Sequence, residues 1–393
     1  MLANPGNVGG PCFAEEEARI PIDTQSRARI PELDGLRGIA IVLVLLYHYT
    51  SIPPGQSQPL LLQRLFAIGW SGVDLFFVLS GFLIGGILLD ACKSLNYFSV
   101  FYARRFYRIM PLYYCWVGVY FIATCFWSNP ESWRAVPIYL LFLQNSFKIN
   151  HAAIGTAWLG ALWSLAVEEQ FYLVIPLAMR LLSRSGILLL LASVLIGAPA
   201  LRVLLHTYLP GHPAAPYMLT ACRGDALAVG VLLAFGWRHE RLKAAFYRYQ
   251  TAFYVLCLVL LFLFVCLAVW KPSQYSLTMY SWGFSLVDAL FGSLLIIALM
   301  VPSGYWAGIC RLPLFLKLGR VSYCLYVIHS LVNLACHEIA FQSLPRFDSP
   351  RTVLISVLAA WMSYVLALCS WRLFEEPLLR RGHKLQYLES ERS

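Results

Sequence analysis

An arginine and a histidine lie on one face of the first apolar segment of this chain, at two different depths. The segment is IPELDGLRGIAIVLVLLYHY, residues 30–49, in which Arg37 and His48 are 11 residues apart. On an α-helix this spacing is three turns plus about 20°, with a rise of about 16 Å. A charge at the centre of a bilayer costs about 2.5 kcal/mol or more, which makes both residues candidates for function. Arg37 would supply a fixed cation, and the imidazole of His48 a base near neutral pH.

Asp34 precedes Arg37 by three residues, so we expect its carboxylate to cap the helix start and hold the guanidinium. His48 has an alternative interpretation as an interfacial histidine that is hydrogen-bonded to a neighbouring helix. The other charged motifs of the chain weigh against this alternative.

A basic and aromatic patch occupies FYARRFYRIMP, residues 101–111. Arg105 and Arg108 are i and i+3 on one helical face, and Arg104 adds a third cation. Guanidinium groups form paired hydrogen bonds to phosphate and stack on π faces, so the patch suits a ligand with several phosphates and a purine. A simple anchor that touches anionic lipid headgroups is the alternative.

Carboxylates occur inside two further apolar segments. Asp74 opens the segment SGVDLFFVLSGFLIGG, residues 71–86, whose glycines predict close helix packing. Glu168 and Glu169 are adjacent in LWSLAVEEQFYLVIPL, residues 162–177. Adjacent helical residues point about 100° apart, so one of the two faces a site, and we favour Glu168.

Two more motifs carry ionisable groups into apolar runs. Arg223 and Asp225 belong to RGDALAVG, residues 223–230, and His329 to LGRVSYCLYVIHSLV, residues 318–332. Arg223 has the alternative of a structural pairing with an acid, and His329 that of a histidine satisfied in the core. All three residues are site candidates.

The composition places these motifs in a membrane protein. The 393 residues are 59% hydrophobic and 13% charged, with a mean hydropathy of +0.66. The net charge of +10 comes from Lys and Arg in short connections beside apolar runs, so no nucleic-acid partner is needed. The 11 cysteines form no CxxC pair and are interpreted as small packing residues rather than metal ligands.

Ten apolar runs are long enough to span a bilayer, which predicts an all-α, polytopic membrane helical bundle. They lie near residues 36–53, 70–91, 109–127, 162–182, 186–205, 218–237, 250–270, 281–302, 320–340 and 353–373. The shorter run 136–147 is expected to be re-entrant or interfacial, because a crossing there would move every later basic cluster to the outside.

This topology puts both termini in the cytoplasm. We predict a cytoplasmic tail over residues 1–29, a membrane domain over 30–380 and a second tail over 381–393. The arginine patch then lies on the inner face, while Arg202 and the candidates His48, Asp74, Glu168, Arg223 and Asp225 lie towards the outside. That arrangement suggests a phosphorylated donor approached from inside and an acceptor reached from outside.

The motifs, in this order and spacing, resemble the acyltransferase 3 family of membrane-bound acyltransferases. The resemblance covers about residues 30–380 and is carried by DGLRG followed by His48, and by GVDLFFVLSGFLI, RRFYRI, WSLAVEEQFYL, RGDALAVG and GRVSYCLYVIH. It implies transfer of an acyl group, usually from acetyl-CoA, to a hydroxyl that is most often on a carbohydrate. Its Arg–ten residues–His motif falls on Arg37 and His48, and its R-x-x-R motif on Arg105 and Arg108.

The residues agree with that chemistry. His48 is the candidate base, with Glu168 or Asp74 to orient its ring, although an acyl-histidine intermediate is equally compatible. Arg37, Arg104, Arg105 and Arg108 are assigned to the donor, and no metal is expected.

Other expectations concern the acceptor and the partners. An exopolysaccharide, lipopolysaccharide or other envelope glycan, free or lipid-linked, leads over a small glycosylated metabolite such as a macrolide. We expect a multi-pass protein of the plasma (inner) membrane whose acceptor specificity lies in helix ends and in residues 128–161. Some relatives carry a fused esterase-like domain, and without one the chain must finish the transfer itself or hand over to separate glycan-assembly proteins.

A secondary transporter is the rival class, but the two related halves it requires are not found.

Overall fold

The part of the chain described by the computed structural model is all helical. It comprises residues 30–50, 66–126, 131–147, 156–270 and 273–388, and no strand occurs in these ranges. The all-α prediction is therefore confirmed. The predicted tail 1–29, the end of the first span at 51–53, residues 148–155 of the expected specificity segment and residues 389–393 lie outside the described residues.

Eight helical runs in the described ranges are long and apolar enough to cross a membrane. Their main helices are α1 (Pro31–Thr50), α3 (Gly72–Ala91), α9 (Arg184–Tyr208), α11 (Thr220–Arg238), α13 (Gln250–Trp270), α14 (Phe284–Met300), α17 (Ser322–Phe341) and α18 (Pro350–Ser370). The predicted spans 109–127 and 162–182 fall in α4 (Tyr97–Phe126) and α8 (Trp163–Leu181), which are long but more polar. The multi-pass helical bundle is thus confirmed, while the number of ten spans stays a prediction.

Short elements connect these helices. They are η1 (Ile68–Ser71), α5 (Glu131–Leu140), α6 (Gln144–Phe147), α7 (Thr156–Leu159), η2 (Gly160–Leu162), α10 (Ala215–Met218), α12 (Glu240–Arg248), η3 (Met279–Gly283), α15 (Tyr305–Cys310), α16 (Pro313–Arg320), η4 (Trp371–Glu375) and α19 (Glu376–His383). The ten residues of α5 rise about 15 Å, half of the hydrocarbon thickness, so this helix alone does not cross. Phe142 then turns the chain with a φ of 54°.

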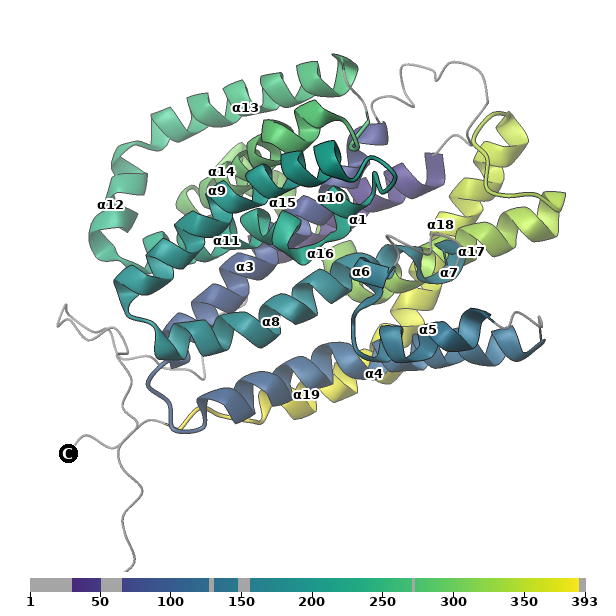
Figure 1. Ribbon diagram of the computed structural model, residues 1–393, viewed down its shortest axis with the longest axis horizontal. Coiled ribbons are helices and arrows are strands. Elements are labelled where there is room, and N and C mark those ends of the chain that lie inside the picture. Colours follow the sequence, from purple (N-terminus) through teal and green to yellow (C-terminus); the bar gives the residue numbers. More distant parts are fainter. Residues whose placement is uncertain (1–29, 51–65, 127–130, 148–155, 271–272, 389–393) are drawn as a thin grey trace, which may run out of the picture.

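The helices divide into a buried centre and a rim (Figure 1). In the runs that contain α3 and α14, 78% and 83% of the apolar window is buried, against 22% in α9 and 28% in α13. The exposed face of α13 consists of large apolar residues such as Leu258 and Phe262. Such a face suits lipid, whereas the polar motifs lie on the central helices.

Small residues bring α3 and α11 into close contact, as the glycines of residues 71–86 predict. A Cβ atom at Gly81 would overlap the carbonyl oxygen of Leu227, and one at Gly230 would overlap that of Val78. A side chain at either position would push the two helices apart. The close approach of α3 and α11 therefore depends on both glycines.

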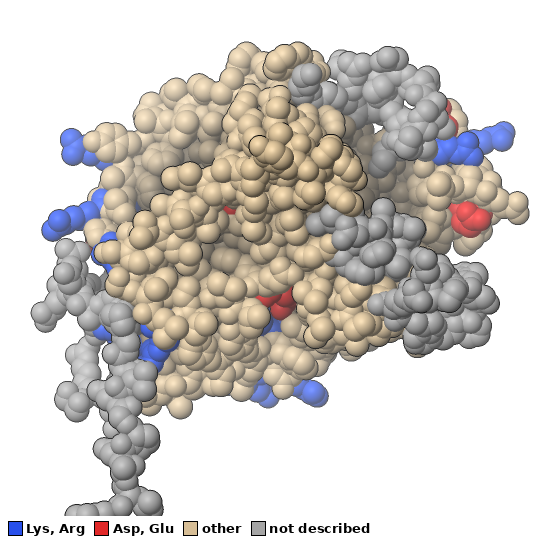
Figure 2. Space-filling model, viewed as in Figure 1, with Lys and Arg blue, Asp and Glu red and all other residues tan. Residues whose placement is uncertain are grey.

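Exposed Lys and Arg lie mainly at the ends and along the lower edge of the face drawn in Figure 2. On this face, Lys and Arg lie at the left end, along the lower edge and at one right-hand corner, and the area between them consists mainly of uncharged residues with a small acidic patch. In the same view of Figure 1, α12 lies at the left end and α4 and α19 run together along the lower edge. The positive-inside rule predicts the orientation of a membrane protein from such a distribution of Lys and Arg. The orientation of this chain in the membrane stays a prediction.

Candidate active site

Two histidines from different helices form the centre of the site. The rings of His48 on α1 and His329 on α17 meet edge to face, with centroids 4.7 Å apart. Nδ1 of His48 lies 2.9 Å from the carbonyl oxygen of Val44, and Nδ1 of His329 lies 2.7 Å from that of Tyr326. A carbonyl oxygen only accepts, so we infer that Nδ1 carries the proton in both neutral rings. The basic nitrogen of each ring is then Nε2.

A narrow cavity leads towards this pair from the arginines. It has a volume of about 100 Å³ and is lined on α3 by residues from Ile84 to Val73. These two residues are 11 positions apart, or about 16 Å along the helix. Arg37 and Tyr326 also line the cavity, and the ring centre of Tyr326 lies 5.9 Å from that of His329. The cavity thus extends from the arginines to a residue that contacts the histidine pair.

Tyr326 connects the cavity to the histidines. Its side chain lines the cavity, donates a hydrogen bond to the carbonyl oxygen of Ala161 at 2.9 Å and lies 2.6 Å from the hydroxyl of Ser164. Its own carbonyl oxygen accepts from His329. The wall of the cavity and the orientation of His329 are therefore set by the same residue.

The arginine end of the cavity is built by α1, α4 and α8. Arg37 contacts Asp34 at 3.5 Å, which confirms the predicted pairing. The predicted cap is wrong, because α1 begins before Asp34, which lies inside its first turn. Arg105 and Arg108 lie one turn apart on α4, and the guanidinium of Arg105 lies 6.0 Å from the ring centre of Tyr172. The Nε atom of Arg105 is buried without a hydrogen-bond partner. This end of the cavity can therefore accept further negative charge.

The structure places Glu168 at the arginine level rather than in the predicted outer half. It lines the same cavity as Arg37, Arg105 and Arg108. The prediction treated residue 162 as the membrane surface, but Leu159 and Leu162 are fully buried and the helix begins inside the fold. Glu168 therefore belongs with the donor end in this structure.

A second cavity of about 120 Å³ shares Arg105 and Arg108 with the first. Its other wall is formed by the end of the described chain, including His383 and Tyr387. Arg104 also lines it but differs from its neighbours, because its Nε donates to the carbonyl oxygen of Leu385 at 3.1 Å. The three predicted donor arginines of α4 thus separate into two that line both cavities and one that holds the chain end.

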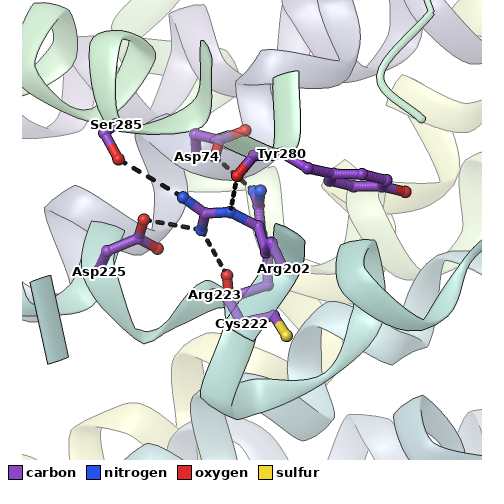
Figure 3. Close-up of polar contacts among 7 residues, drawn as sticks. All are labelled: Asp74, Arg202, Cys222, Arg223, Asp225, Tyr280 and Ser285. Atoms are coloured by element: carbon purple, nitrogen blue, oxygen red, sulfur yellow. Dashed lines mark hydrogen bonds and ion pairs between the residues drawn. The ribbon is translucent and has the colours of Figure 1, made fainter. Parts of the chain in front are cut away.

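Asp74 and Arg223 belong to a separate buried cluster (Figure 3). Arg223 donates to Asp74 in a short ion pair, and Arg202 donates to Asp225 at 2.7 Å. Arg202 also donates to the carbonyl oxygens of Cys222 and Tyr280, at 2.6 and 3.0 Å. The structural pairing considered for Arg223 is confirmed. The predicted role of Asp74 in orienting His48 is not what this geometry shows, because that carboxylate is held by Arg223.

The comparison with known protein families agrees with this arrangement. Residues 30–372 match the model of the family described as the acyltransferase domain of acyltransferase 3, which is most of the chain. The chain belongs to the acyltransferase 3 family. Both histidines, the four predicted donor arginines and the buried cluster lie inside the matched range.

Relatives of this acyltransferase 3 chain include two named O-acetyltransferases. The peptidoglycan O-acetyltransferase OatA of Listeria monocytogenes is 30% identical over 383 residues, which cover 91% of this chain and 57% of the relative. The O-acetyltransferase OatA of Staphylococcus aureus is 26% identical over 373 residues, covering 90% and 58%. The chain thus spans a little more than half the length of these relatives. No solved structure matches it.

Two charged residues of this acyltransferase 3 chain were not among the predicted site candidates. Arg202 was predicted only to lie towards the outside, near the end of the span 186–205; it lies within α9 and is fully buried. Asp288 lies on α14, 1% exposed, and neither carboxylate oxygen has a hydrogen-bond partner. An arginine in GAPALRVLL and an aspartate in SLVDALFG are visible signals, because each is a single charge inside an apolar run.

Proposed function

We propose that this protein is an integral membrane O-acyltransferase that moves an acetyl group from acetyl-CoA, bound from the cytoplasm, to a hydroxyl of an envelope carbohydrate. The observation that carries the proposal is the cavity that runs from Arg37, Arg105 and Arg108 to the wall formed by Tyr326, beside the histidine pair. A ligand with phosphates at one end and a reactive group at the end of a long arm matches this shape.

The arginine end supports an anionic donor. Arg105 and Arg108 form no ion pair with a described carboxylate and face both cavities. Guanidinium groups bind phosphate oxygens through paired, charge-assisted hydrogen bonds. The phosphates of acetyl-CoA would stay at this end, and its pantetheine arm would carry the thioester along the cavity.

The histidine end supports hydroxyl activation. Nε2 of His48 would take the proton of the acceptor hydroxyl. At the same time the hydroxyl oxygen would attack the carbonyl carbon of the thioester. The new C–O bond forms, the C–S bond breaks, and the proton passes from His48 to the leaving thiolate. General base catalysis of this kind contributes typically 10²- to 10⁴-fold. Attack by Nε2 itself, giving an acyl-histidine that the hydroxyl then cleaves, uses the same atom.

The acceptor assignment is supported by the named relatives. The Listeria relative is a peptidoglycan O-acetyltransferase, and peptidoglycan is a carbohydrate polymer outside the membrane. His48 lies about 16 Å along α1 from Arg37, towards the side opposite the arginine cavity. We propose that the protein lies in the plasma membrane. The proposed acceptor is an envelope glycan, lipid-linked or polymeric, that reaches the outer side of the membrane.

Substitution of His48 tests the catalytic assignment. His48→Ala should reduce O-acetyl groups on the envelope glycans by at least about 100-fold, measured by mass spectrometry in cells that lack the native gene. The matched control is His206→Ala, a histidine on the rim helix α9. Retained acetylation in His48→Ala at equal membrane abundance would remove this residue from the catalytic role.

Sealed vesicles test the donor and its side. Radiolabelled acetyl-CoA, which does not cross the bilayer, should acetylate glycan in inside-out vesicles and not in right-side-out ones. Transfer in the opposite orientation would reverse the proposed topology. Absence of transfer in both orientations, with intact acceptor present, would contradict acetyl-CoA as the donor.

A further inference from the structure

The end of the described chain folds back along α4. We call residues 379–388 the C-terminal strap; they lie beyond the range of the family match, which ends at residue 372. The side-chain amide of Asn96 donates to the carbonyl oxygen of Gln386 at 2.9 Å and accepts from the backbone N–H of Leu388 at 2.8 Å. The N–H of Leu95 donates to the carbonyl oxygen of Leu388 at 3.0 Å. The strap is therefore fixed at a defined register.

Arg104 holds the middle of the strap. Its Nε and Nη2 atoms both donate to the carbonyl oxygen of Leu385, at 3.1 and 2.5 Å, and its guanidinium lies 5.0 Å from the ring centre of Tyr387. A Cβ atom at Gly382 would lie 3.3 Å from Cβ of Tyr107, so the strap also packs closely on α4. These contacts set the position of Tyr387.

Tyr387 and the arginines face one cavity from opposite walls. Arg105, Arg108, His383 and Tyr387 all line it, and its lining contains no carboxylate. Nε of Arg105 and the hydroxyl oxygen of Tyr387 are both buried without a hydrogen-bond partner in the described structure. Burial raises the pKa of Tyr387, so its hydroxyl keeps the proton at neutral pH and can donate. Two guanidinium groups and a hydroxyl donor around a hollow are a set of groups suited to phosphate oxygens.

We propose that the C-terminal strap completes the phosphate site of the donor, with the Tyr387 hydroxyl as a binding group for the nucleotide end of CoA opposite Arg105 and Arg108. This rests on the proposed function for the identity of the donor. Acetyl-CoA owes part of its affinity to a segment outside the matched family domain, and the strap selects for donors that carry the nucleotide.

CoA binding to the purified full-length protein in nanodiscs tests the proposal without turnover. Tyr387→Phe removes the hydroxyl and keeps the ring beside Arg104. Its dissociation constant for CoA, measured by calorimetry, should rise about tenfold or more, since a hydrogen bond to a charged group is lost. Binding of pantetheine, which lacks the nucleotide, should not change. Tyr305→Phe, at a tyrosine that is 97% exposed, is the matched control.

The outcomes separate this proposal from the wider function. An unchanged CoA affinity in Tyr387→Phe, or an equal loss for CoA and pantetheine, would overturn the role of the strap. A loss that appears only in nanodiscs with anionic lipid would also overturn it and assign the phosphate to a lipid headgroup. Normal CoA binding without acetyl transfer in the wild type would instead contradict the proposed function alone.

Discussion

Arg202 lies among carbonyl groups and an acid, and Arg223 lies between Asp74 and aromatic rings. Arg105 and Arg108 instead face hollow space. The first two are 0% and 1% exposed, and each has an aspartate as ion-pair partner. The second two line both cavities and form no ion pair with a described carboxylate. In an apolar setting the surroundings of an arginine therefore say more about its role than its depth does. The paired residues tie helices together, and the unpaired ones are available to a ligand.

The largest expected effect is on the paired side of this comparison. Arg202→Ala leaves Asp225 buried without its cation and frees the carbonyls of Cys222 and Tyr280. Loss of one partner of a buried ion pair costs about 3–5 kcal/mol. We expect a large fall in the thermal unfolding midpoint in detergent and low membrane abundance. An unfolding midpoint equal to that of the wild type would contradict a stabilising role for this cluster.

A double substitution sharpens the interpretation of the second pair. Asp74→Asn combined with Arg223→Met removes both charges, so it should destabilise the protein less than Arg223→Met alone, by about 2 kcal/mol or more. The measurement is the coupling free energy from thermal unfolding of the two single variants and the double variant. Additive effects would mean that the contact seen between the two side chains contributes nothing.

On the unpaired side, activity should change and stability should not. Arg105→Ala combined with Arg108→Ala is expected to raise the KM for acetyl-CoA by at least about tenfold, because two charge-assisted contacts to phosphate are lost. The unfolding midpoint should stay near that of the wild type. An unchanged KM for acetyl-CoA would contradict donor binding by these two arginines and favour the alternative, in which they contact lipid headgroups.

The smallest effect is expected at an exposed ion pair. Glu376 and Arg380 are i and i+4 on α19, 2.8 Å apart, with side chains 38% and 76% exposed. Glu376→Gln should change the free energy of unfolding by less than about 0.5 kcal/mol, since water screens such pairs. A change comparable to that of Arg202→Ala would show that exposure does not separate the classes of ion pair in this protein.

Much of the fold followed from hydropathy and spacing. The all-helical bundle, the contact of Asp34 with Arg37 and the close packing at Gly81 were predicted and are found. Local patterns suffice for these features because each depends on residues within one helix or on the size of one residue. The arginine patch, predicted to lie before the span 109–127, is continuous with that span in the 30-residue helix α4.

The site was less predictable because its pairings join distant segments. The contact between His48 and His329 spans 281 positions, and the ion pair between Asp74 and Arg223 spans 149. Sequence placed every outer candidate in one group and could not divide it into a histidine pair and an ion-pair cluster. Glu168 was misplaced in depth because the buried turn before α8 carries no charge or proline that would reveal it.

The Arg202 side chain has a consequence for the way related sequences diverge. One guanidinium is shared by the carbonyl oxygens of α11 and η3 and by the carboxylate of Asp225. Substitution of Arg202 or Asp225 alone would leave the other buried without its ion-pair partner, so positions 202 and 225 should be replaced together or not at all. Correlated substitution at these two positions among relatives would show that contacts joining α9, α11 and η3 constrain the sequence.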